Sequence, residues 1–118
     1  MKDFRTLQVW QKSHSLTMKL YNETRSFPKD EVYGITSQLR RAMSSVPTNL
    51  AEGCGRGSDK DFSRFVQIAM GSASEAEYLI LLSGDLNYLR KEATEKYIEL
   101  LNEIKKMLVA LIKTLNRN

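Results

Sequence analysis

Apolar residues recur at intervals of three and four along almost the whole chain, and this spacing constrains the fold more than any other feature. Side chains at that spacing share one face of an α-helix, whereas side chains on one face of a strand recur at every second residue. Only two prolines interrupt the 118 residues. The pattern predicts an all-α protein with four helices, over about Thr6–Ser26, from near Asp30 to the glycines at 53–57, from Ser58 to about Leu89, and over Glu92–Leu115.

The connections between these helices are only a few residues long. Helices joined by such short loops pack beside their chain neighbours and run in opposite directions. We therefore expect a single domain over residues 1–118, folded as an antiparallel up-down-up-down four-helix bundle.

Pro47 lies inside the second predicted helix. It has no amide hydrogen for the carbonyl of Met43, so it predicts a kink, with Ser44 and Ser45 placed to bond the released carbonyls. After the glycine-rich stretch, Ser58 followed by Asp61 is the pattern of a new helix start.

The periodicity predicts which apolar residues of the second and third helices point inward. They are Val32, Ile35, Leu39, Ala42, Val46 and Leu50 in the second helix, and Phe62, Phe65, Ile68, Ala69, Ala76, Leu79, Leu82, Leu86 and Leu89 in the third.

The third and fourth helices carry more apolar residues than one buried face can use. The runs 78–82 and 107–112 are apolar all the way round. A face left over in this way is most simply covered by another copy of the chain, so we expect a homo-oligomer.

The charge is modestly positive and unevenly distributed. Eighteen Lys and Arg against fourteen Asp and Glu give +4, with +4 in residues 1–29 and +3 in residues 90–118 but −3 in residues 58–89. The first and last helices are thus the basic ones, which permits binding to a polyanion. One cysteine, no leader-like start and no long apolar run favour a cytoplasmic protein with no membrane segment.

The tight turn between the second and third helices sets residues opposite one another when their numbers sum to about 115. Arg41 and Glu75 should then form a partly buried ion pair, with Gln38 near Glu77 and Arg40 pointing elsewhere and free. The same register places Gly71 and Ser72 opposite Ala42 and Met43, where small residues allow close helix approach.

A phosphate-binding cluster at the turn is the functional alternative to a purely structural reading. Its candidate residues are Arg40, Arg41, Arg56, Lys60 and Arg64. In the structural reading, Glu52 pairs with Arg56 while Asn49 bonds backbone groups opened by Pro47, and Asp59 and Asp61 compete with any anion.

No catalytic, metal or cofactor site is expected. His14 is the only histidine and Cys54 the only cysteine, so neither finds the partners that a nucleophile or a metal site requires. His14 is expected to be a core or interface residue. We predict neither an enzyme nor a small-molecule substrate.

Three segments resemble one known family. They are FRTLQVWQKS at residues 4–13, FPKDEVYGITSQLRRAMSSVPTNLAEGCGR at 27–56, and FVQIAMGSASEAEY at 65–78. Through these segments the chain resembles the four-helix-bundle proteins encoded in 23S ribosomal RNA intervening sequences. The resemblance implies a homopentamer and makes these residues signature positions: Arg40, Arg41, Asn49, Glu52, Gly53, Gly55, Arg56, Gly71, Ser72 and Glu75, with Pro47 inside the same motif.

The same bundle resembles the accessory variability proteins of diversity-generating retroelements, which associate with a reverse transcriptase and its RNA. Two hypotheses follow. The first is a non-enzymatic oligomer that binds structured RNA or a ribonucleoprotein through basic groups on the first and last helices. The second is a protein adaptor or scaffold without nucleic-acid binding, for example a partner of a reverse transcriptase.

Overall fold

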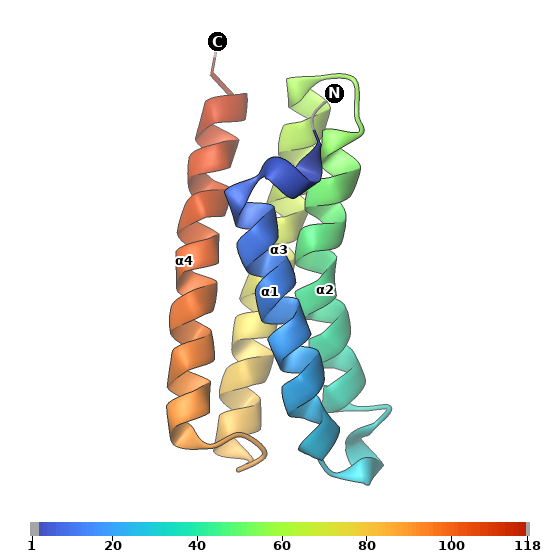
Figure 1. Cartoon of the computed structure of the whole chain (residues 1–118), viewed down its shortest axis with the longest axis vertical. Coiled ribbons are helices and arrows are strands. Elements are labelled where there is room, and N and C mark those ends of the chain that lie inside the picture. Colours follow the sequence, from blue (N-terminus) through green and yellow to red (C-terminus); the bar gives the residue numbers. More distant parts are fainter. Residues whose placement is uncertain (1–2, 118) are drawn as a thin grey trace.

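Four α-helices account for most of the chain in the computed structural model, which describes residues 3–117 (Figure 1). They are α1 (Gln8–Glu23), α2 (Ile35–Cys54), α3 (Asp59–Asp85) and α4 (Lys91–Leu115). Three single 3-10 turns lie outside them, η1 (Phe4–Thr6), η2 (Thr24–Ser26) and η3 (Lys29–Glu31). No strand occurs in the described part of the chain, and the predicted all-α, four-helix class is confirmed.

The helices pack side by side into a rod of about 47 × 23 × 20 Å, and successive helices run in opposite directions in Figure 1. The pairing of α2 with α3 is the most extensive, and α1 packs against both α2 and α4. The largest side chains with almost no exposed surface form one core: Leu20, Leu39, Met43, Leu50, Ile80, Leu101, Ile104 and Leu108. All four helices contribute to this core, so burying apolar surface fixes the bundle.

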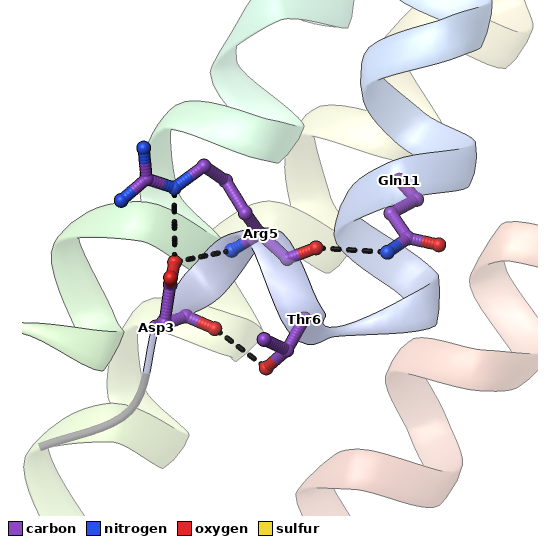
Figure 2. A network of polar contacts seen from close by, with 4 residues as sticks. All are labelled: Asp3, Arg5, Thr6 and Gln11. Carbon is purple, nitrogen blue, oxygen red and sulfur yellow. Dashed lines mark hydrogen bonds and ion pairs between the residues drawn. The ribbon is translucent and has the colours of Figure 1, made fainter.

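A polar network fastens the N-terminal turn to α1 (Figure 2). Asp3 Oδ1 accepts hydrogen bonds from the backbone N–H and the Nε of Arg5, both at 3.0 Å. Thr6 Oγ1 donates to the Asp3 carbonyl at 2.7 Å, and Gln11 Nε2 donates to the Arg5 carbonyl at 2.8 Å. The first helix is therefore shorter than predicted, because separate 3-10 turns take up residues 4–6 and 24–26.

The second helix begins five residues later than the sequence suggested. A 3-10 turn and Gly34, whose φ of −108° and ψ of −121° lie outside the helical region, come before it. Glu31 Oε1 accepts from the backbone N–H of Ile35 at 3.3 Å and caps the helix. Val32 consequently lies outside α2 and is 51% exposed, so its predicted place in the core was wrong.

Pro47 lies buried within a continuous α2. The carbonyl of Met43, which Pro47 leaves without its usual donor, faces the Oγ1 of Thr17 at 3.4 Å. Ser44 bonds the Arg41 carbonyl instead, so the predicted role of Ser44 at the released carbonyl falls to a residue of α1. The kink itself stays a prediction.

The turn from α2 to α3 is tight, and Gly53 makes it so. A Cβ at Gly53 would lie 2.7 Å from Phe62 Cδ1 and 3.0 Å from Phe65 Cβ. Ser58 then caps α3 by accepting from the backbone N–H of Asp61 at 3.2 Å, which confirms the predicted helix start.

The third helix ends at Asp85, four residues before the predicted end. Asn87 has φ of 65°, and the N–H of Tyr88 donates to the carbonyl of Ser83 at 2.9 Å, which together form a left-handed helix stop. Leu86 is 44% exposed as a result, and its predicted burial was wrong, whereas Leu89 is buried from the turn.

Candidate nucleic-acid interface

The five basic residues predicted to share one phosphate site do not lie together. Arg40 and Arg41 belong to the second turn of α2, whereas Arg56 follows its far end and Lys60 and Arg64 begin α3. At 1.5 Å per residue, about 20 Å of helix separates the two groups. The predicted cluster was wrong because the register that pairs α2 with α3 puts Arg40 and Arg41 beside the middle of α3, away from the turn.

Charges at the turn are largely compensated. Arg56 Nη2 pairs with Glu52 Oε2 at 3.0 Å, and Arg64 Nη2 lies 3.7 Å from Asp61 Oδ1. Both guanidinium groups also lie over the ring of Phe65, at 4.7 and 5.4 Å from its centre. The predicted pairing of Glu52 with Arg56 is confirmed.

The side chains of Arg41 and Glu75 form no ion pair or hydrogen bond within residues 3–117, and both are exposed. The predicted pair was wrong, because an exposed pair gains too little energy to hold two long side chains together. Glu77 turns to α4 instead of toward Gln38, and Lys105 Nζ donates to its Oε1 at 2.8 Å.

Arg40, predicted to be free, is held in place. Its Nε donates to Thr24 Oγ1 at 2.8 Å and its Nη2 to the carbonyl of Tyr21 at 3.1 Å. The guanidinium also lies 4.8 Å from the centre of the Tyr21 ring. This residue therefore links α2 to the end of α1.

Two signature positions, Asn49 of α2 and Ser72 of α3, both contact Ser45. Ser45 Oγ lies 2.9 Å from Ser72 Oγ, and Asn49 Nδ2 donates to both the carbonyl and the Oγ of Ser45, at 2.8 and 2.9 Å. Asn49 thus bonds the Ser45 carbonyl and not the Met43 carbonyl that Pro47 leaves open, so its predicted role was wrong. Ser72 lies opposite Ser45, two positions from its predicted place opposite Met43.

Gly71 does not provide a close approach to α2. A Cβ at this position would have no neighbour within 4 Å outside its own helix, and the residue is exposed. The predicted contact with Ala42 and Met43 was wrong, because Gly71 lies on the exposed side of α3, whereas Ala69 and Ala73 are on its buried side.

An exposed seam runs along the outer side of α3 instead. Ile68, Gly71, Glu75 and Tyr78 follow one another at intervals of three and four, and Leu81 continues the row. Ile68, Tyr78 and Leu81 are 47%, 59% and 47% exposed, so the predicted burial of Ile68 was wrong. This α3 seam has the spacing of a helix-packing face, with Gly71 and Glu75 between its apolar ends.

Cationic side chains gather where α1 and α4 lie side by side. Two adjoining hollows line this α1–α4 groove, with Lys12 and Lys19 contributed by α1, Lys96 by α4 and Arg90 just before α4. Three carboxylates, those of Glu23, Glu92 and Glu103, share the same walls.

Two of the three carboxylates in the α1–α4 groove have partners of their own. Lys12 pairs with Glu103, and this hydrogen bond lowers the pKa of the Glu103 carboxyl. Glu23 Oε1 accepts from Tyr97 OH at 2.7 Å. Lys19, Lys96 and Arg90 make no ion pair within residues 3–117. The charge distribution along the sequence indicated these helices, although not which lysines stay unpaired.

The remaining candidates carry little chemistry. His14 is exposed and stacks on Trp10 with ring centres 4.8 Å apart, so of its two predicted places the core is wrong and an interface stays a prediction. Cys54 is buried. Within residues 3–117 no three His, Cys, Asp or Glu side chains come together to hold a metal ion. No helix among these residues is long and apolar enough to span a membrane.

Fold and surface together define a small all-α protein of four antiparallel helices, whose candidate site is a polar groove between its first and last helices. Residues 5–110 match the 23S rRNA-intervening sequence protein family. The chain belongs to that family, as the sequence motifs indicated.

A solved structure of the same shape supports this assignment. The crystal structure of a protein of unknown function from the S23 ribosomal protein family of Bacteroides thetaiotaomicron VPI-5482 superposes with a TM-score of 0.80. The two sequences are 26% identical, over 89% of this chain and 98% of the other. No curated protein matches the chain.

Proposed function

We propose that this protein is a non-enzymatic, cytoplasmic, homo-oligomeric helical bundle that binds structured RNA or a ribonucleoprotein through the α1–α4 groove. The observation that carries the proposal is the set of unpaired cations in this groove, Lys19, Lys96 and Arg90. Cations without a carboxylate partner are free to neutralise phosphates, and phosphate contacts supply most of the affinity for nucleic acid.

Self-association is the second part of the proposal. The α3 seam exposes Ile68, Tyr78 and Leu81 around a glycine that has no neighbour within 4 Å. A helix of another copy packed there would bury this apolar surface. The resemblance to the family implies five copies.

Filter binding to a structured RNA across a salt series tests the groove. Lys19→Gln combined with Lys96→Gln should weaken binding and lower the slope of log affinity against log salt by roughly 1.5, at about 0.7 to 0.9 per lost phosphate contact. The matched control, Lys60→Gln with Lys113→Gln, removes two exposed lysines elsewhere and should leave the slope close to that of the wild type. No affinity at low salt, or an affinity indifferent to salt, would contradict the proposal.

A protein adaptor without nucleic-acid binding is the alternative function. It is favoured by the number of cations already neutralised, since Lys12, Arg56, Arg64 and Lys105 each have a carboxylate within 4 Å. Capture of partners with and without nuclease treatment separates the two functions, because only partners bridged by RNA are lost after treatment.

A further inference from the structure

The chain passes from α1 into α2 at one end of the bundle (Figure 1). A hollow with cationic walls lies at this passage. Its volume is about 360 Å³, within the range of small-ligand sites. Arg25, Lys29 and Arg40 line it together with Thr36, and no carboxylate is among its lining residues. We call it the α1–α2 hollow.

Arg40 is preorganised in this hollow. Its Nε and one hydrogen of its Nη2 are occupied by Thr24 and Tyr21, at 2.8 and 3.1 Å, which fixes the plane of the guanidinium. The Nη1 group takes part in neither bond, so its two hydrogens can be donated to a ligand oxygen. A guanidinium already fixed in place loses little side-chain entropy on binding.

Arg25 and Lys29 add two cations without partners. Both are exposed, and neither forms an ion pair or hydrogen bond with any side chain of residues 3–117. The nearby carboxylate of Glu31 is already engaged by the N–H of Ile35 at 3.3 Å and the hydroxyl of Tyr88 at 2.8 Å. Asp30, next to Lys29 in the chain, does not line the hollow.

Thr36 supplies a separate indication of a ligand. It is only 6% exposed, and its Oγ1 is the one buried side-chain polar atom in residues 3–117 that has no hydrogen-bond partner. Buried hydroxyls are almost always hydrogen-bonded, so an unbonded hydroxyl in a hollow lined by cations requires an explanation. Thr36 also belongs to the first turn of α2, where the positive end of the helix dipole favours an anion.

We propose that the α1–α2 hollow binds a phosphate group, with Arg25, Lys29 and Arg40 as its cationic contacts and the Thr36 hydroxyl as a neutral donor. Three cations and an unpaired hydroxyl match the charge and the acceptor oxygens of a phosphate. The phosphate belongs either to RNA or to a small phosphorylated molecule. The site does not depend on RNA binding by the α1–α4 groove, because inorganic phosphate can report on it in the absence of RNA.

An NMR titration of the full chain with inorganic phosphate tests the site. The backbone amides of Thr36 and Ser37 should shift saturably. Arg25→Ser combined with Lys29→Ser should weaken this binding by roughly 100-fold, about tenfold for each charge-assisted hydrogen bond lost, and Thr36→Val should separately weaken it by roughly tenfold. Lys60→Ser with Arg64→Ser, at the opposite end of the bundle, should leave it unchanged.

Two results would overturn the proposal: no saturable shift at these amides, or equal weakening by the two double substitutions. A second titration with RNA identifies the source of the phosphate. Movement of the same amides assigns the hollow to RNA phosphates, whereas RNA binding that leaves them in place assigns it to a small phosphorylated ligand. If RNA does not bind but inorganic phosphate still saturates the hollow, RNA binding by the α1–α4 groove is contradicted and phosphate binding by the hollow is not.

Discussion

At the scale of single residues, two buried threonines show that a hydroxyl stabilises the fold when it is hydrogen-bonded and destabilises it when it is not. Thr17 Oγ1 lies 2.7 Å from the carbonyl of Ser13 and 3.4 Å from that of Met43, so it covers an acceptor that Pro47 leaves open. Thr36 Oγ1 has no partner. Burying an unbonded hydroxyl costs free energy that a methyl group of the same shape does not.

Thr36→Val should therefore raise the free energy of unfolding by about 1 kcal/mol when no phosphate is present. Its matched control, Thr17→Val, should lower the free energy of unfolding by about 1 to 2 kcal/mol, because the hydroxyl's bond to the Ser13 carbonyl and its longer contact with the Met43 carbonyl are lost. Urea denaturation of both variants measures the difference. A change of the same sign in both would contradict the assignment of one satisfied and one unsatisfied hydroxyl.

Single residues of the candidate site were the least predictable from sequence. Arg56 and Lys60 could be placed at the turn, but only the packed structure shows that Arg40 bonds Tyr21 and Thr24 at the other end of α2. Thr36 gave no signal at all, because a threonine in a first helical turn has the same sequence pattern whether or not its hydroxyl is bonded. Long-range partners decide such cases, and local spacing does not contain them.

At the scale of helices, polar contacts tie α4 to the rest of the bundle. Tyr97 OH donates to Glu23 of α1 at 2.7 Å, and Lys12 pairs with Glu103. Tyr88, in the turn before α4, donates to Glu31 at 2.8 Å, which raises the pKa of the Tyr88 hydroxyl. The Tyr97 and Tyr88 hydrogen bonds are partly buried, so water competes with them less than with the exposed Lys12–Glu103 pair.

Burial, and then the hydrogen bond to Glu23, raises the pKa of Tyr97 to about 12 from 10.0. The folded protein thus holds the Tyr97 proton more tightly than the unfolded chain does. The contribution of protonated Tyr97 to the free energy of unfolding is therefore complete below pH 10 and is lost as the pH rises toward 12. Tyr97→Phe lacks this component and should lose less stability than the wild type across that interval. Urea denaturation at the two pH values measures it, and an equal loss in both proteins would contradict the assigned coupling.

The helices themselves were predictable because apolar periodicity extends over many turns, but their ends were not. The start at Ile35 depends on the backbone of Gly34 and a cap from Glu31, and the stop after Asp85 depends on Asn87 in a left-handed conformation. A periodic apolar pattern continues through Val32 and Leu86, so it extends the predicted helices past both points. Turn geometry overrides the pattern there.

At the scale of the whole molecule, the proposed RNA-binding groove and the apolar α3 seam lie on different helices. Lys19, Lys96 and Arg90 line the α1–α4 groove, whereas the apolar α3 seam belongs to another helix of the bundle. Copies that meet through α3 would therefore leave the α1–α4 grooves open, and several grooves on one assembly would bind a long polyanion with increased avidity.

Sedimentation velocity of the full chain at micromolar concentration tests most directly whether the protein works as an assembly. We expect a species several times heavier than the 13.5 kDa chain, and dissociation when Tyr78→Glu and Leu81→Glu place charges on the α3 seam. Tyr33→Glu, at a residue 95% exposed and outside the seam, should leave the assembly intact. A wild-type protein that sediments as a stable, dispersed single chain would contradict the account.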